Sequence, residues 1–355
     1  MKERNGYIAL WKYIFAIVIV FFHCRALFPN WGIPVFYLGY LGVEFYFIVA
    51  GYYLAKKTLG IKKNPDKIGE ETFNFILDKL KRFMPYIVIA FAICMPIRAY
   101  YLDWSINEIL NSVWNLLLIR NLGIGKVYVM NHLWYIITML ISMGILYPVL
   151  RKFKENYIYI FSPIISILGL AYMFKLGTLG LTYDTWNGYV NIGLIRAFVE
   201  LNIGLYIYII VDKINKINYT RITKNIITII SQILLLGVLY GTSFTTNPKT
   251  YEFVMFLMII VATTLMLTKH MQGNKFLNNK FIFYLEKQST LIYINHLTMI
   301  SVVKYLPIFE GYTPIRQTLT IVILSIFFSV VEEFILKIFI KKEINLKIKK
   351  IFIKD

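Results

Sequence analysis

This chain of 355 residues is short of acidic residues and of cysteine, and it has no polar stretch long enough to build a soluble domain. The only cysteines are Cys24 and Cys94, which excludes a disulfide framework and a cysteine-based metal site. Aspartate and glutamate number 19 against 38 lysines and arginines, so the formal net charge is +19. Because no soluble basic domain is present to hold a polynucleotide, we exclude nucleic acid as a partner.

Several catalytic motifs are also missing. The sequence contains no Gly-x-x-x-x-Gly-Lys phosphate loop, no His-Glu-x-x-His, no Cys-x-x-Cys and no Gly-x-Ser-x-Gly. ATP-driven transport, zinc hydrolysis and serine hydrolysis are therefore unsupported. We expect no metal cofactor.

Long apolar runs, in contrast, recur from end to end, and hydrophobic residues make up 58% of the chain. A run of about twenty apolar residues is long enough to cross a bilayer as a helix. The sequence therefore predicts an all-α polytopic transmembrane bundle, organised as one domain over residues 1–355. The ten expected spans are 7–27, 35–55, 83–102, 130–150, 157–174, 191–211, 225–244, 251–268, 282–303 and 317–340.

The basic residues also orient these spans. Segments between alternate spans carry 26 lysines and arginines on one side and six on the other. Because cytoplasmic segments are enriched in these residues, we expect both termini to be cytoplasmic. The longest connections are 56–82, which is polar and basic, and 103–129, which lies outside. We interpret 103–129 as an amphipathic helix on the bilayer surface, as a cover over an external opening, or as a loop lying on the bilayer.

Ionisable residues inside a bilayer are costly, about 2.5–3.5 kcal/mol each on insertion scales, so each suggests a functional site. Lys12, His23 and Glu44 lie in the first two spans. Lys12 and His23 are eleven residues apart, which in a helix returns to nearly the same face after about 16 Å. We therefore expect them at different depths along one wall of one cavity.

Histidines gather at one depth. With the N-terminus inside, His23, His132 and His296 all fall near the outer face, in three different spans. An imidazole titrates near neutrality and can take or return a proton, so it is the commonest general base. The shared depth favours one catalytic cluster over three separate packing residues.

Other intramembrane charges leave alternatives open. Arg196 and Glu200 are four residues apart and can form a structural pair on one helix face, or contact a substrate hydroxyl. Glu44 could orient His23, or it could neutralise Lys12 or Arg98.

Several of these residues also lie in recognisable motifs. Lys12 precedes His23 by eleven positions, Gly42 to Phe47 reads Gly-Val-Glu-Phe-Tyr-Phe, and Ala50-Gly51 follows. Further motifs are Arg82 three residues before Pro85, His132-Leu133-Trp134 and Tyr293-x-x-His296. Together they resemble the acyltransferase-3 family of bacterial membrane acyltransferases over nearly the whole chain. Lys12 stands where that family usually has arginine, and Ala50-Gly51 where it usually has Ser-Gly.

This resemblance implies an O-acyltransferase in the bacterial inner membrane. Such an enzyme would move an acyl group, most simply acetyl, from cytoplasmic acyl-CoA to a hydroxyl of an external glycan or lipid-linked sugar. Lys12 and Arg82 would hold the anionic CoA head. His23 would be the general base or carry the acyl group, with Glu44 as its orienting acid. The expected acceptor-binding residues are His132, Trp134, Arg196 and His296.

Two other readings remain open at the level of sequence. The same polar column could be the path of a carrier or flippase for a lipid-linked glycan. Matched broken helices in two halves, which many transporters show, are not visible here because Pro85, Pro96, Pro148 and Pro163 all lie in the first half. The chain could also be a non-catalytic family member.

Overall fold

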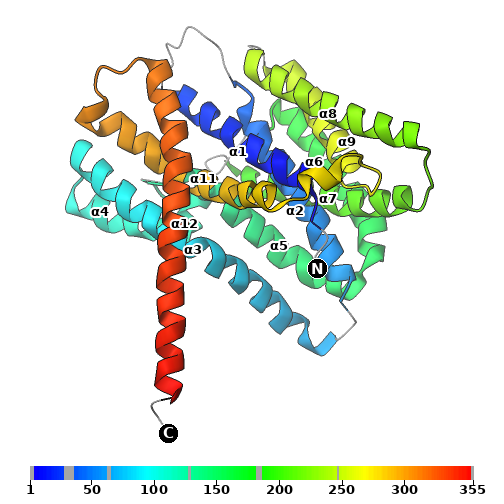
Figure 1. The fold of residues 1–355 in the computed structure, drawn as a ribbon, viewed down its shortest axis with the longest axis horizontal. Helices are drawn as coiled ribbons and strands as arrows, with labels where there is room; N and C mark the ends of the chain where they lie inside the picture. Colours follow the sequence, from blue (N-terminus) through cyan, green and yellow to red (C-terminus); the bar gives the residue numbers. More distant parts are fainter. Residues whose placement is uncertain are drawn as a thin grey trace.

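The computed structural model describes residues 4–27, 36–61, 65–126, 129–180, 186–245 and 248–352, with side chains omitted for 248–250 and from 339 onward. It is an almost entirely helical bundle (Figure 1). The helices are α1 (Gly6–Leu27), α2 (Gly42–Leu59), α3 (Ile68–Tyr101), α4 (Ile106–Val113), α5 (Trp134–Phe153), α6 (Glu155–Leu176), α7 (Ile192–Asn215), α8 (Arg221–Phe244), α9 (Pro248–Met266), α10 (Asn274–Leu277), α11 (Lys280–Tyr305) and α12 (Pro314–Phe352).

Short elements connect these helices. Single 3-10 turns are η1 (Gly39–Leu41), η2 (Pro65–Lys67), η3 (Trp114–Leu117), η4 (Ile119–Leu122), η5 (Asn131–Leu133) and η6 (Pro307–Phe309). One antiparallel hairpin joins β1 (Trp186–Asn187) to β2 (Val190–Asn191), and Trp186 pairs with Asn191.

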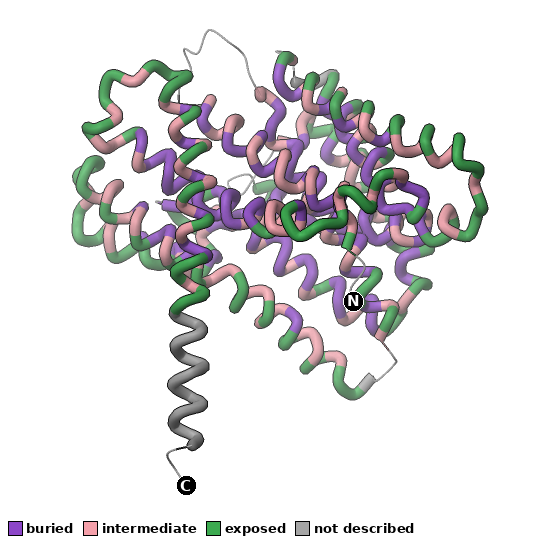
Figure 2. Tube along the Cα trace, in the orientation of Figure 1, coloured by how far each residue is buried: buried purple, intermediate pink, exposed green. Residues whose placement is uncertain are grey.

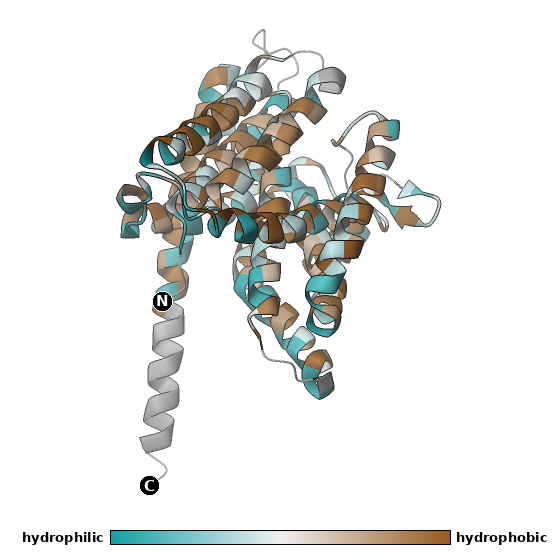
Figure 3. Ribbon diagram, turned by 90° about the vertical axis from the view of Figure 1, so that its right-hand side faces the viewer, coloured by the Kyte–Doolittle hydropathy of each residue, from teal (hydrophilic) through white to brown (hydrophobic). Residues whose placement is uncertain are grey.

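The predicted all-α membrane bundle is confirmed. Each expected span corresponds to a helix, namely α1 to α3, α5 to α9, α11 and α12. Within the described residues, seven helices are long and apolar enough to cross a membrane, and α9 contributes a shorter apolar stretch. Buried residues concentrate where the helices meet, and exposed ones line the outer helices (Figure 2). Polar residues gather at helix ends and connections, and apolar ones cover the helices between them (Figure 3).

Helix α3 differs from the sequence-based expectation. Residues 68–82, which we assigned to a connecting loop, form the first turns of a helix of 34 residues. Pro85 and Pro96 lie inside this helix and do not end it. The early turns are polar, so an apolar window cannot detect them. As a result, Arg82 lies on a helix and not in a loop.

Helix α4 confirms the amphipathic helix expected within residues 103–129. It begins with a capping box, in which Ser105 and Glu108 satisfy each other's backbone groups. The hydrogen bonds from Ser105 lower the pKa of the Glu108 carboxyl. One stripe of large apolar side chains is exposed, namely Ile106, Leu110, Val113, Trp114 and Leu117. This stripe suits a helix lying on the bilayer surface.

Two sets of helix contacts position the polar residues. Helices α2 and α7 cross in direct backbone contact, because a Cβ on Gly51 would overlap the carbonyl of Leu201, and one on Gly204 would overlap that of Ile48. Helix α11 packs against α1, α3 and α12. It therefore contacts both the first and the last span, which also touch each other.

Candidate active site

Three histidines from distant parts of the chain form one layer. His23 lies on α1, His132 on η5 at the start of α5, and His296 on α11. The His296 ring centroid lies 4.8 Å from that of His23 and 4.7 Å from that of His132. The cluster expected from their common depth is therefore present, with His296 at its centre.

Backbone carbonyls set the proton positions in this layer. His23 Nδ1 lies 2.9 Å from the Ile19 oxygen, and His296 Nδ1 lies 2.7 Å from the Tyr293 oxygen. A carbonyl only accepts, so each Nδ1 carries the proton of the neutral ring. His296 Nε2 is then an acceptor, and it lies 3.3 Å from His23 Nδ1. No hydrogen bond to His23 Nε2 is found among the described residues, so this nitrogen can act as a base.

His132 has a different role in the layer. Its Nε2 donates to the Ile294 oxygen at 2.9 Å, and the Tyr293 hydroxyl donates to its backbone oxygen. Both contacts fasten the start of α5 to α11. His132 and His296 are buried, whereas His23 is half-buried. Of the three, His23 is the most exposed.

Lys12 meets α11 one level further in. Its Nζ lies 2.6 Å from Glu286 Oε1, and the side chains are 20% and 29% exposed. The Tyr46 hydroxyl donates to the Lys12 backbone oxygen. Lys12 and His23 therefore lie on the face of α1 that contacts α11, as their spacing predicted. Glu44 is not the partner of Lys12.

A group of cations surrounds the inner end of this wall. Lys79 on α3 lies within electrostatic range of Arg82, Lys57 and Lys12. Lys57 also lies over the Phe75 ring, 4.2 Å from its centroid. Like charges repel, so such a group is favourable only where counter-charge is available. The structure thus places the two residues expected to hold the CoA head, Lys12 and Arg82, in one basic group.

Glu44 does not contact His23. We considered it as the acid that orients His23, but it contacts Arg196 on α7 through the guanidinium Nη2 and, at 3.1 Å, Nε. The His23 side chain contacts Ile19 and His296 instead. The crossing of α2 and α7 brings Glu44 to Arg196, across 152 positions in sequence that no local pattern links.

Arg196 forms the expected structural pair with Glu200, with Nε 3.3 Å from Oε1. Its guanidinium carbon lies 5.2 Å from the Trp134 ring centroid. Arg196, Glu44 and Glu200 are fully buried, and Trp134 is nearly so. Buried charges persist when they are paired in this way. Arg196 and Trp134 therefore belong to the buried packing next to His132, and their role in binding the acceptor stays a prediction.

Sequence reasoning missed the polar stripe of α11. Glu286, Ser289, Tyr293 and His296 follow one another at intervals of three or four residues, which places them on one helix face. Glu286 contacts Lys12, Tyr293 contacts His132, and His296 contacts His23. The periodicity of these four residues was the signal that could have identified Glu286.

Comparison with known proteins gives a consistent result. The model of the acyltransferase-3 family, described as an acyltransferase domain, matches residues 5–332. No curated protein and no solved structure matches the chain. The match covers the histidine layer, the basic group and every span up to α12. The chain therefore belongs to the acyltransferase-3 family and is a membrane acyltransferase.

Proposed function

We propose that this protein transfers an acyl group, most simply acetyl, from cytoplasmic acyl-CoA to a hydroxyl of a glycan at or beyond the outer face of the membrane. The observation that carries the proposal is the α1–α11 wall. On it, Lys12 meets Glu286 and His23 meets His296, about 16 Å apart along the helix axis. CoA has an anionic head and a long arm ending in the thioester. A cation and a base separated along one wall suit that shape.

At the inner end, the basic group of Lys12, Lys57, Lys79 and Arg82 would bind the phosphates of the CoA head. The phosphates would add negative charge beside this basic group, where the lysines and the arginine repel one another. Lys12 would then exchange its contact with Glu286 for a phosphate oxygen. The pantetheine arm would extend along α1 toward His23.

At the outer end, His23 Nε2 would accept the proton of the acceptor hydroxyl as its oxygen attacks the thioester carbonyl. The carbon–sulfur bond then breaks, and the same proton passes from His23 to the thiolate, giving CoA and the ester. The one proton on His23 Nδ1 lies between two acceptors, the Ile19 oxygen at 2.9 Å and His296 Nε2 at 3.3 Å, and both would stabilise the imidazolium formed between these steps. In the alternative chemistry, His23 Nε2 attacks the thioester first and the carbon–sulfur bond breaks, which releases the CoA thiolate. The acceptor hydroxyl then attacks the acyl-imidazole, the bond from carbon to Nε2 breaks, and the hydroxyl proton passes to the thiolate.

The test uses purified protein in proteoliposomes with radiolabelled acetyl-CoA and an envelope glycan fraction. We expect label to move to the glycan with wild-type protein and not with His23→Ala. His270→Ala is the matched control, because His270 lies outside the histidine layer and contacts the Ile214 oxygen. Equal labelling by wild type and His23→Ala would refute the proposed role of His23. Glycan translocation without labelling would favour a carrier.

A further inference from the structure

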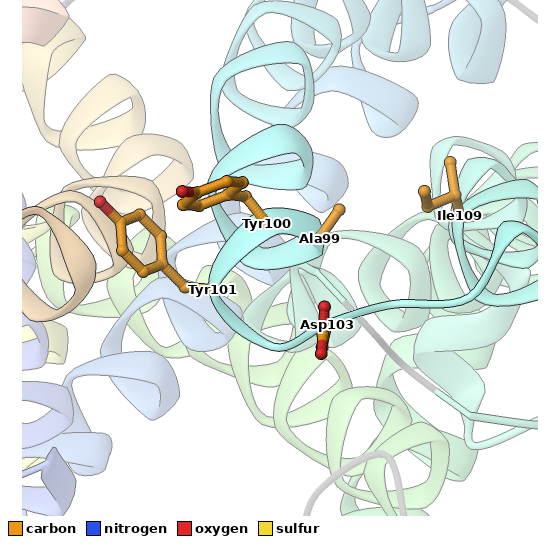
Figure 4. Close-up of a pocket in the computed structure, with 5 residues that line it drawn as sticks. All are labelled: Ala99, Tyr100, Tyr101, Asp103 and Ile109. Atoms are coloured by element: carbon orange, nitrogen blue, oxygen red, sulfur yellow. The ribbon is translucent and has the colours of Figure 1, made fainter.

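A pocket of about 700 Å³ opens at the outer end of α3 (Figure 4). Its lining residues come from the last turn of α3, the bend that follows and α4, namely Ala99, Tyr100, Tyr101, Asp103 and Ile109. The pocket thus combines two aromatic rings with one carboxylate. None of these residues belongs to the histidine layer or to the basic group.

The two tyrosines present their rings to the outside. Tyr100 is 77% exposed and Tyr101 is 38% exposed, and their centroids are 4.9 Å apart in an edge-to-face arrangement. Tyr101 stacks on Tyr305 of α11, with centroids 6.0 Å apart and planes 17° from parallel. Packing of this kind fixes the rings before any ligand arrives, which lowers the entropy cost of binding.

Asp103 has a backbone conformation that aspartate tolerates well. Its φ is +56°, in the left-handed region that asparagine and aspartate tolerate better than most residues. Asp103 lines the pocket together with the two tyrosines, whose rings extend away from it in Figure 4. An ionised carboxylate accepts hydrogen bonds and donates none, so it would bind hydroxyl groups and repel an anion.

This pocket is linked to the histidine layer through the seam between α3 and α11. Along it, the Thr298 hydroxyl donates to the Ala90 oxygen, and Arg98 Nε lies 3.0 Å from Ser301 Oγ. Tyr101 and Tyr305 close the seam at its outer end. Nine residues of α11 separate His296 from Tyr305, which is about 13–14 Å of helix. A chain of two or three sugar units spans that distance, and a single sugar does not.

We infer that the pocket of Tyr100, Tyr101 and Asp103 is a binding subsite for a neutral, hydroxyl-rich sugar of an oligosaccharide acceptor. This inference rests on the proposed function, because it places the reacting hydroxyl of the same acceptor at His23. The polarised C–H groups on a sugar face are attracted to the negative face of an aromatic ring. Asp103 would accept from the sugar hydroxyls. The acceptor is therefore a glycan chain and not a small hydroxylated metabolite.

Exposed tyrosines also occur at membrane interfaces simply as aromatic anchors. A tyrosine that only anchors the protein in the membrane needs an amphipathic side chain but no neighbouring carboxylate. Its replacement would not change the affinity for sugars of any length. Those two differences separate the readings.

The test is a ligand-observed NMR titration of the full chain in lipid nanodiscs. The probes are ladders of one to four sugars made from N-acetylglucosamine and from glucose. For at least one ladder, we expect the tetrasaccharide to bind at least tenfold more tightly than the monosaccharide. Tyr101→Leu and Asp103→Asn should each reduce the tetrasaccharide affinity about five- to tenfold and leave that of the monosaccharide unchanged. Tyr101→Phe keeps the ring and should retain most of the affinity.

Tyr189→Ala is the matched control, because Tyr189 is fully exposed on the outer hairpin and is not part of the pocket. Equal affinities for one and four sugars in both ladders would overturn the subsite. So would Tyr101→Leu and Asp103→Asn variants that bind the tetrasaccharide like wild type. Acyl transfer from radiolabelled acetyl-CoA is measured on the same wild-type preparation. Length-dependent binding without acyl transfer would refute the proposed function and leave the subsite intact.

Discussion

His296 Nε2 faces His23 Nδ1 at 3.3 Å, so the half-buried histidine contacts a second, fully buried one. The buried ring is itself fixed by the Tyr293 oxygen. In other acyl-transfer sites a carboxylate orients the catalytic histidine. Here the His296 imidazole occupies the corresponding position next to His23. Several measurable consequences follow.

The first prediction concerns the separate roles of these two rings. His23→Ala should lower kcat by at least 10³-fold, because general acid–base catalysis contributes about 10²–10⁴-fold and no other ring in the layer can replace it. His296→Gln should lower kcat about 10–100-fold with little change in KM, because only orientation is lost. Steady-state kinetics with acetyl-CoA measure both. A His296→Gln variant with wild-type kcat would show that His296 is only a packing residue.

A second prediction concerns the contact between Lys12 and Glu286. Lys12→Arg should keep or improve acyl-CoA affinity, because the charge remains and a bidentate group replaces a point charge. Lys12→Gln should weaken acyl-CoA binding about ten- to a hundredfold, as expected when a charged hydrogen-bonding partner is lost. Binding of CoA and thermal stability are measured side by side.

The double change Lys12→Gln with Glu286→Gln is the control for that experiment. If Lys12 only neutralises Glu286, the double variant recovers stability and CoA affinity together. If Lys12 binds phosphate, the double variant recovers stability alone, and CoA affinity stays low. Full recovery of CoA affinity would therefore rule out Lys12 as part of the CoA site.

The free energy of unfolding should depend more on buried Arg196 than on buried Glu200. Arg196→Gln leaves Glu44 and Glu200 without their cation and should cost about 3–5 kcal/mol, as breaking a buried pair typically does. Glu200→Gln should cost less, because Glu44 and Arg196 remain as a neutral pair with two contacts. Thermal unfolding in detergent compares the variants. Equal losses for both would mean that the three groups do not form one charge network.

Orientation in the membrane can be measured with few background signals, because Cys24 and Cys94 are both buried. Tyr189→Cys should react with a membrane-impermeant maleimide added to intact cells. Lys216→Cys, at the opposite ends of the helices, should react only after the membrane is opened. The reverse pattern would place the histidine layer near the cytoplasm and refute an external acceptor.

The spans could be predicted from sequence because bilayer thickness sets a length that an apolar run either reaches or does not. The polar start of α3 could not, since its helical turns carry no apolar signal. The pair of Arg196 and Glu200 was predictable from its spacing of four residues. Glu44 with Arg196 and Lys12 with Glu286 were not, because each joins two helices whose packing no local pattern specifies.

The parallel arrangement of α1 and α11 has a consequence for how such a chain can change. His23 is eleven positions after Lys12, and His296 is ten positions after Glu286. Both contacts between α1 and α11 therefore depend on these two spacings. One inserted residue between Lys12 and His23 would turn the imidazole by about 100° around the helix while the helix stayed apolar and continuous. Inserting or deleting a residue between Lys12 and His23 should therefore be as harmful as replacing either of them, although a helix one residue longer or shorter would still cross the bilayer.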